Sequence, residues 1–181
     1  MTTKIGIIVG SLRKDSWNRK LALQLIQHAP STLSCEFIEI GQLALYNQDL
    51  DANPPQEWVT FREQILKQDG ILFVTAEYNR SVPGVLKNAI DVGSRPYGKS
   101  AWNGKPTAVV SSSPGAIGGF GANHHLRQSL VFLNMPCLQF EAYIGSISNL
   151  FDAEGKIAKS ETGEFLSKIM GSFSQWVEKN K

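Results

Sequence analysis

Residues 5–18 read Ile-Gly-Ile-Ile-Val-Gly-Ser-Leu-Arg-Lys-Asp-Ser-Trp-Asn, and this stretch predicts a strand, a loop and the start of a helix. The apolar run has the length of a buried strand and ends at Gly10. Beyond the loop, apolar residues recur at helical spacing, at Leu21, Ala22, Leu25, Ile26 and Ala29. This order of elements favours anion binding, because the first N–H groups of a helix are unpaired and the helix dipole is positive there.

The polar side chains of the loop suit a phosphate group, because hydroxyls and amides donate hydrogen bonds and a guanidinium adds a fixed charge. The candidates are Ser11, Arg13, Ser16 and Asn18. Gly10 is the only glycine of the loop, so a terminal monophosphate fits better than the pyrophosphate of a dinucleotide, which needs G-x-G-x-x-G. The alternative is an ordinary capped helix with Asp15 or Ser16 as N-cap. On this loop alone both interpretations stay open.

The composition is typical of a soluble globular protein. With 181 residues, 42% of them hydrophobic and 19% charged, we expect one domain with a full central sheet. The net charge of +2 argues against a nucleic-acid partner. Cys35 and Cys137 form neither a metal-type pair nor a disulfide framework, as expected in a reducing compartment. We expect a cytoplasmic protein without a membrane partner, because we find no signal peptide and no apolar run of bilayer length.

Hydrophobic patterns predict four further strands and four further helices. The strands are Cys35–Ile40, Gly70–Thr75, Thr107–Ser111 and Pro136–Phe140. The helices carry apolar residues at Trp58, Phe61 and Ile65, at Leu86, Ala89 and Ile90, at Leu126, Leu130 and Leu133, and from Phe165 to Val177. Alternating strands and helices predict a parallel sheet covered on both faces, with the ligand beyond the carboxyl ends of its strands. The loops after the first, third and fourth strands are therefore the candidate site.

Two motifs follow the third predicted strand: residues 76–84, Ala-Glu-Tyr-Asn-Arg-Ser-Val-Pro-Gly, and residues 86–91, Leu-Lys-Asn-Ala-Ile-Asp. Together with Gly-Ser-Leu-Arg at residues 10–13, Ser16 and Asn18, they resemble the NADPH-dependent FMN reductases, and among these the bacterial quinone and chromate reductases. The resemblance runs from residue 4 to about residue 145 and includes Gly118-Gly119 and His-Leu-Arg-Gln at 125–128. Several motifs in the right order are more specific than any one of them.

The resemblance implies a flavodoxin-like fold, a doubly wound five-stranded parallel sheet of order 2-1-3-4-5, with residues 1–181 as a single FMN-binding domain. It implies that the FMN phosphate is held by Ser11, Arg13, Ser16 and Asn18. It implies that Glu77, Tyr78 and Asn79 lie along the flavin ring, mostly through backbone groups, and that Ser113 and Gly115 close the other side. It also implies a homodimer or homotetramer with sites near the subunit boundary.

Three positions depart from the family pattern. Ala76 stands where a proline is usual, which is expected to loosen its loop. Val92 stands where a tryptophan is usual, and Gly121 where an arginine often stands. These departures bear on subunit contacts and substrate preference more than on the flavin.

The activity that the resemblance implies is a two-step exchange. NAD(P)H docks on the open face of the flavin, passes a hydride and leaves, and a small-molecule acceptor such as a quinone then takes the electrons, with chromate, azo or nitro compounds as side substrates. The flavin carries the redox chemistry, so no catalytic acid or base is assigned. The loops do not decide between NADH and NADPH. The alternatives are a flavodoxin-like electron carrier, which the net charge of +2 disfavours, and a nucleotide-binding regulator.

Other motifs predict structure rather than chemistry. Residues 93–100 match the phosphate loop of ATPases, but this loop follows a helix and leads into a turn, whereas the motif needs a strand before it and a helix after it. His124 and His125 are neighbours on a helix and cannot share a metal, so no metal site is assigned. Ser111-Ser112-Ser113 lacks the hydrolase elbow, and neither cysteine precedes a phosphatase loop.

Overall fold

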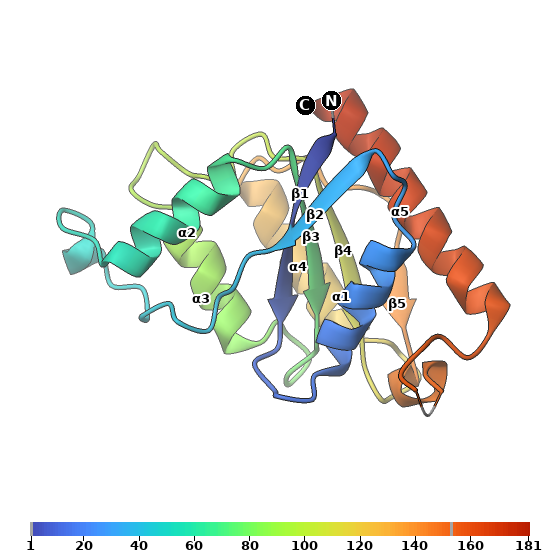
Figure 1. Cartoon of the computed structure of the whole chain (residues 1–181). Helices are drawn as coiled ribbons and strands as arrows, with labels where there is room; N and C mark the ends of the chain where they lie inside the picture. Colours follow the sequence, from blue (N-terminus) through green and yellow to red (C-terminus); the bar gives the residue numbers. More distant parts are fainter. Residues whose placement is uncertain (1, 153) are drawn as a thin grey trace.

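In the computed structural model, which describes residues 2–152 and 154–181, five parallel strands form one sheet in the order β2-β1-β3-β4-β5, as predicted (Figure 1). The strands are β1 (Thr3–Gly10), β2 (Leu33–Phe37), β3 (Gly70–Thr75), β4 (Thr107–Ser112) and β5 (Ala142–Ile144). The helices are α1 (Trp17–Gln27), α2 (Gln56–Leu66), α3 (Gly84–Gly93), α4 (Phe120–Phe132) and α5 (Ser160–Asn180), with 3₁₀ turns η1 (Gln48–Leu50) and η2 (Ile147–Leu150). No helix in this part of the chain combines the length and hydrophobicity needed to cross a bilayer.

The alternation of side chains along each strand divides the core into two layers. Ile8 and Phe73 face the layer that α2, α3 and α4 cover, whereas Ile7 and Val74 face the layer that α1 and α5 cover. All four side chains are fully buried. A parallel sheet covered on both faces needs strands that are apolar throughout, which is why β1 and β3 lack the polar alternation of an exposed sheet.

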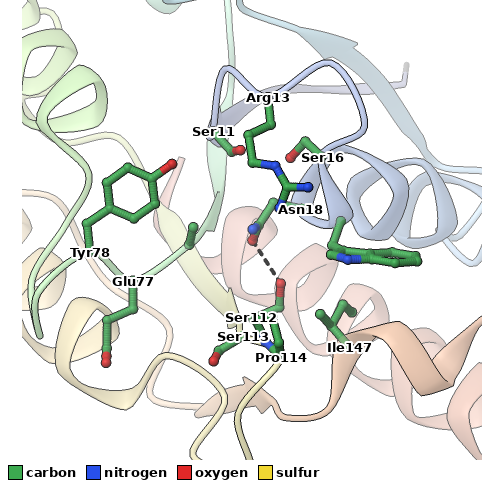
Figure 2. A pocket seen from close by; sticks show the side chains of 12 residues that line it. Ser11, Arg13, Ser16, Asn18, Glu77, Tyr78, Ser112, Ser113, Pro114 and Ile147 are labelled. Carbon is green, nitrogen blue, oxygen red and sulfur yellow. Dashed lines mark hydrogen bonds between the residues drawn. The ribbon is translucent and has the colours of Figure 1, made fainter.

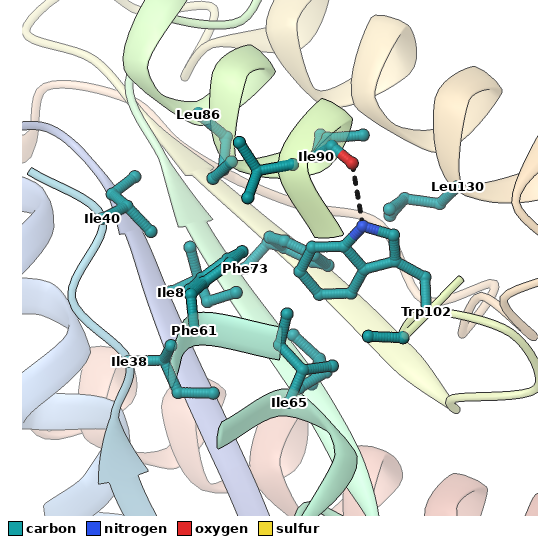
Figure 3. Close-up of a cluster of buried hydrophobic side chains, with 14 of the residues drawn as sticks. Ile8, Ile38, Ile40, Phe61, Ile65, Phe73, Leu86, Ile90, Trp102 and Leu130 are labelled. Carbon is teal, nitrogen blue, oxygen red and sulfur yellow. Dashed lines mark hydrogen bonds between the residues drawn. The ribbon is translucent and has the colours of Figure 1, made fainter. Parts of the chain in front are cut away.

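Trp102 fills the middle of the first layer (Figure 3). Its indole Nε1 donates a hydrogen bond of 2.9 Å to the carbonyl oxygen of Ile90, so the buried polar atom is satisfied. The Phe61 ring meets it edge-on with the ring centroids 5.9 Å apart. Because Gly93 lies directly against the indole, no Cβ atom fits at that position.

The fifth strand lies later in the chain than the sequence predicted. The predicted strand Pro136–Phe140 is wrong: Cys137 forms only an isolated bridge to Thr107, and pairing with β4 resumes at Ala142. Between these points the Arg127 guanidinium binds the carbonyl oxygens of Leu138 and Phe140, at 2.8 and 3.0 Å. Those carbonyl groups are satisfied by a side chain, so the segment need not form a ladder.

The second strand is also shifted relative to its predicted bounds. It covers Leu33–Phe37 rather than Cys35–Ile40, although the N–H of Ile38 still bonds to the carbonyl oxygen of Ile7 at 2.9 Å. Ile38 and Ile40 then turn into the core beside α2. The hydrophobicity of Ile38 and Ile40 therefore reflects their burial in the core and does not extend β2 beyond Phe37.

The three central strands end at one level of the sheet. Gly10 of β1 pairs with Thr75 of β3, and Thr75 pairs with Ser111 of β4. Gly10 is required here because a Cβ atom would lie 2.7 Å from Oγ1 of Thr75. The winding direction reverses between β1 and β3, so the loops after β1, β3 and β4 converge at the position where such sheets bind ligands.

Candidate functional site

A pocket of about 110 Å³ lies beyond the carboxyl ends of β1, β3 and β4 (Figure 2). Seven of the nine residues assigned from the sequence line it: Ser11, Arg13, Ser16, Asn18, Glu77, Tyr78 and Ser113. The other two, Asn79 and Gly115, adjoin lining residues in the chain but do not line the pocket themselves. The cofactor-binding role of all nine residues stays a prediction. Residues from three separate loops thus meet at one place.

Ser16 reconciles the two interpretations of the first loop. It is the N-cap of α1, and its Oγ accepts the backbone N–H of Arg19 at 3.2 Å. A hydroxyl that accepts one hydrogen bond can still donate its own hydrogen, so Ser16 can cap the helix and bind an anion together. The first turn of α1 contains no acidic residue, which leaves its positive end uncompensated.

Arg13 provides a positive charge beside the pocket. The side chain is exposed and extends over the pocket beside Ser16 (Figure 2). Among the described residues, no carboxylate lies within ion-pair distance of Arg13. Its forked donors can therefore approach an anionic ligand without breaking an existing pair.

Asn18 joins the first loop to β4. Its Oδ1 accepts a hydrogen bond of 2.9 Å from Oγ of Ser112, and both side chains are buried. Because the carbonyl oxygen of the amide is engaged, the NH₂ group is the part of Asn18 that can serve an anion. Ser112, which sequence reasoning did not select, therefore orients a predicted site residue.

The loop after β3 is a tight two-residue hairpin. Tyr78 and Ser81 exchange two backbone hydrogen bonds of 3.0 Å, and Asn79 and Arg80 between them have φ values of 51° and 63°. Two successive positive φ angles are typical of a type I′ turn, in which asparagine is common and arginine is rare. The hairpin directs the Tyr78 ring toward the pocket and Glu77 away from the first loop (Figure 2).

The loop after β4 is fixed to the edge of the sheet. The N–H of Ser113 bonds to the carbonyl oxygen of Ile144 at 3.1 Å, and the carbonyl oxygen of Ser113 accepts the N–H of Ile147 at 3.2 Å. Oγ of Ser113 accepts the N–H of Gly115 at 2.9 Å. These hydrogen bonds hold this side of the pocket to β5 and η2, and Ser113 and Pro114 line it.

Sequence reasoning missed five lining residues: Trp17, Ala76, Ser112, Pro114 and Ile147. Four of them adjoin assigned residues and could have been found as neighbours of the motifs. Ile147 belongs to no motif and lies at the pocket because its N–H bonds to the carbonyl oxygen of Ser113, which places η2 beside the loop after β4. Trp17 stacks on Phe151, with ring centroids 5.4 Å apart, and forms an apolar wall of the pocket next to Ser16.

The remaining sequence candidates lie elsewhere. Residues 93–100 begin with the last residue of α3, Gly93, and the rest of the segment enters no helix, as the sequence indicated. His124 contacts the hydroxyl of Tyr143 and His125 contacts that of Ser81, so the two imidazoles point to different partners. Burial raises the pKa of the Cys137 thiol, an effect that Arg127 only partly offsets, so the thiolate that a phosphatase needs is disfavoured.

Comparisons with known proteins agree with this geometry. The sequence model of the NADPH-dependent FMN reductases matches residues 3–148. A quinone reductase of Pseudomonas putida is 60% identical over 179 residues, which cover 98% of this chain and 96% of that protein. A 2-hydroxy-1,4-benzoquinone reductase of a Burkholderia species is 46% identical, covering 98% of this chain and 97% of that one.

Solved structures place the chain in the same group. FerB, a flavoenzyme NAD(P)H:(acceptor) oxidoreductase from Paracoccus denitrificans, superposes with a TM-score of 0.93 at 39% identity, and the match covers 99% of both chains. A flavodoxin from Pseudomonas aeruginosa, at 14% identity and a TM-score of 0.58, shares the fold alone. Because the family model spans most of the chain and relatives of high identity cover nearly all of it, the chain belongs to the NADPH-dependent FMN reductase family.

Proposed function

We propose that this chain binds FMN in the pocket and uses NAD(P)H to reduce quinones. The observation that carries the proposal is the meeting of an anion-binding helix start with two loops that leave space for a ring, all within one pocket. The named activities of the relatives support it, since two of them are quinone reductases and FerB is an NAD(P)H-dependent flavoenzyme.

The donor set fits the phosphate end of FMN. Ser11, Ser16 and Asn18 supply neutral donors, Arg13 supplies the charge, and the unpaired N–H groups of the first turn of α1 point to the same place. The phosphate of FMN is a dianion, and these groups would hold it without any buried carboxylate nearby on α1. The Trp17 ring, which stacks on Phe151, would limit the access of water to the hydrogen bonds between these donors and the phosphate. Exclusion of water would strengthen those hydrogen bonds.

The ring end is defined by two loops of different character. Tyr78 projects from the hairpin after β3. Ser113 and Pro114 lie on the loop after β4, which is hydrogen-bonded to β5. We assign the flavin ring to the space between them, with backbone groups of residues 77–79 and the loop near Gly115 as its partners. The N–H groups of Ser113 and Gly115 already bond within the chain, and Pro114 has none. Backbone N–H groups that stabilise negative charge on the ring would therefore come from the residues after Gly115, where glycine permits close approach.

Bound FMN supplies the redox chemistry, since its ring accepts a hydride from a nicotinamide and returns the electrons to an acceptor. The chain contributes binding, orientation and charge stabilisation. Neither a catalytic acid nor a catalytic base is assigned, and the exposed ring of Tyr78 marks the side from which both substrates would approach. Chromate, azo and nitro compounds are proposed as secondary acceptors because electron transfer to them needs no specific pocket.

The electron-carrier alternative finds less support. The chain has a net charge of +2, whereas carriers of that class use a strongly acidic face to dock redox partners. The relatives that cover nearly the whole chain are enzymes by name. An enzyme that turns over nicotinamide therefore explains more of the observations.

One experiment separates these functions. The purified protein is titrated with FMN, and the holoprotein is then mixed with NADH or NADPH, with and without 1,4-benzoquinone, while nicotinamide absorbance is followed. We expect tight FMN binding and rapid, quinone-dependent oxidation. A bound flavin that does not react with either nicotinamide would favour the carrier, and a protein without affinity for FMN would overturn the proposal.

We also propose a cytoplasmic homodimer or homotetramer in which residues 1–181 form one FMN-binding domain. Exposed apolar side chains support the assembly, because Tyr97 and Phe132 are 91% and 88% exposed in the single chain. Light scattering coupled to size-exclusion chromatography tests it. A monomer at micromolar concentration would contradict this part of the proposal.

A further inference from the structure

The carboxylate of Glu77 is occupied by the protein itself, although Glu77 lines the pocket. Its Oε2 accepts the backbone N–H of Ala122 at 3.0 Å, and its Oε1 accepts a hydrogen bond from Arg80 at 3.0 Å. The side chain is only 12% exposed. Both oxygens of this carboxylate already accept a hydrogen bond from the chain, so Glu77 has a structural role in addition to any contact with a ligand.

Glu77 acts as a remote cap of α4. This helix begins after Gly119, which has no side chain to bond to the free N–H groups of the first turn. Ala122 is the third residue of the helix, and its N–H is one that an N-cap side chain ordinarily accepts. Glu77, 45 positions earlier, takes that role, and its negative charge also favours the positive end of the helix dipole.

Gly121 allows the hairpin to lie this close to α4. A Cβ atom at this position would lie 2.8 Å from the carbonyl oxygen of Arg80 and 3.0 Å from Oε2 of Glu77. The first contact is to backbone, so rotation of a side chain cannot relieve it. Any larger residue at 121 must push the hairpin away from the helix.

The hairpin is strained and is fixed at both ends. Arg80 has a φ of 63°, a region that side chains other than glycine and asparagine rarely adopt. Such conformations persist where surrounding contacts determine them. Here the contacts are the bonds of Glu77 and a bond of 3.0 Å between Oγ of Ser81 and Nδ1 of His125, also on α4.

We infer that Glu77 and Gly121 are positioning residues that seat residues 77–81, here called the Tyr78 hairpin, on α4 and thereby set the width of the flavin-ring slot. The inference rests on the proposed function, since it assigns the ring to the space between Tyr78 and Ser113. It differs from the expectation drawn from the sequence, in which the departure at Gly121 bears less on the flavin than on substrate preference. The loop after β4 is bonded to β5, and Tyr78 faces it across the pocket (Figure 2). The width of the slot therefore depends on where the contacts with α4 hold the Tyr78 hairpin.

The decisive test compares Gly121→Ala with Gly171→Ala. Gly171 lies in α5, where a Cβ atom meets nothing within 4 Å, so it is a matched control for the added methyl group. Binding of FMN and of riboflavin, which lacks the phosphate, is measured by quenching of flavin fluorescence. We expect Gly121→Ala to weaken both flavins by about the same factor, roughly tenfold, because an overpacked contact acts on the ring they share.

Four outcomes that differ from the expected one are distinguished by this comparison. Unchanged binding in Gly121→Ala overturns the inference, and so does a loss confined to FMN, because that would place the effect at the phosphate. If the wild-type protein binds neither flavin, the proposed function itself fails. Gly171→Ala is expected to equal the wild type, and a matching loss there would mean that any added methyl group disturbs binding.

Variants of Glu77 test the same contact between the Tyr78 hairpin and α4 without adding bulk. Glu77→Gln keeps an oxygen that can accept the N–H of Ala122, whereas Glu77→Ala removes it, so flavin affinity should fall in the order wild type, Gln, Ala. Hydrogen exchange of the peptide containing Ala122 should accelerate in the unliganded Glu77→Ala protein and remain slower in Glu77→Gln. Equal exchange in all three proteins would contradict the capping role.

A kinetic readout separates positioning from simple loss of folded protein. At saturating FMN, Gly121→Ala should raise the KM for a two-ring naphthoquinone more than the KM for 1,4-benzoquinone, because a shifted hairpin changes the space above the ring. A merely structural defect would lower the amount of active holoenzyme and leave both KM values unchanged. Equal KM values in variant and wild type would argue against control of the slot by Gly121.

Discussion

The hydroxyl of Ser112 donates a hydrogen bond of 2.9 Å to Oδ1 of Asn18, and 94 positions of sequence separate the two residues (Figure 2). The bond fixes the start of α1 against the end of β4, the two elements that are assigned to the phosphate and to the ring. It also fixes which end of the Asn18 amide faces a ligand. A structural contact between a helix start and a strand end thus determines which group of Asn18 is offered to the anion.

Asn18→Asp should separate the structural from the ligand-binding role of this position. An aspartate can still accept the hydrogen bond from Ser112 and is favourable at a helix N-terminus, so we expect the unliganded protein to keep its Tm. The new carboxylate would repel the FMN phosphate and remove an N–H donor, and we expect an affinity loss of about 100-fold. Thermal unfolding and an FMN titration measure the two effects, and an unchanged FMN affinity would place the phosphate elsewhere.

Arg13→Ala should weaken FMN binding without affecting the fold. Charge-assisted hydrogen bonds to a phosphate contribute about 1.5–3 kcal/mol, so the dissociation constant should rise by roughly tenfold or more. Lys14→Ala is the matched control, because Lys14 is equally exposed but does not line the pocket. If both variants lose FMN affinity equally, the loss comes from the lower positive charge of the region rather than from a specific contact. The assignment of Arg13 to the phosphate is then wrong.

The sequence predicted the sheet and most of the pocket because both follow from local rules. Buried strands such as Gly70–Thr75 are continuous apolar runs, and the polar loops that follow the central strands meet because parallel strands end at one edge. The residues from Ser11 to Asn18 form a contiguous motif, so their grouping needed no knowledge of distant contacts.

What the sequence could not predict depends on contacts between distant residues. The fifth strand was misplaced because Arg127 binds the carbonyl groups that a strand at Pro136–Phe140 would have paired. Ile147 reaches the pocket only through the fold of η2, and Glu77 caps a helix 45 positions away. No propensity or spacing within either segment indicates these partners.

Gly93→Ala tests whether the ATPase-like segment is structural. Gly93 is the last residue of α3 and lies against the buried indole of Trp102, so a methyl group there must displace the ring from its hydrogen bond to Ile90. We expect a loss of about 3 kcal/mol in the free energy of unfolding, typical of severe overpacking. Chemical denaturation measures it.

The control for this prediction is Lys99→Ala, which changes the lysine that a phosphate loop would use. Lys99 is exposed, so we expect a change within about 0.5 kcal/mol and no effect on flavin binding. ATP should not raise the Tm of the wild-type protein. A nucleotide-dependent rise in Tm that Lys99→Ala abolishes would restore the ATPase interpretation.

Tyr143 should make the folded protein lose stability at alkaline pH. Burial, together with the neighbouring Glu141 carboxylate, raises the pKa of Tyr143 from 10.0 to about 12. The unfolded chain releases this proton first, so between pH 10 and 12 the folded state holds more protons and its stability falls as the pH rises. Below pH 10 both states keep the proton and the contribution is fully present.

Tyr143→Phe should therefore flatten the decline in Tm between pH 10 and 12, although the variant loses the 2.8 Å contact with His124 and is less stable at neutral pH. Spectrophotometric titration of the four tyrosines provides the second measurement, because the component that ionises last should disappear in the variant. If that component persists in Tyr143→Phe, the high pKa belongs to another tyrosine, and Tyr46, whose pKa burial also raises, is the one to replace next.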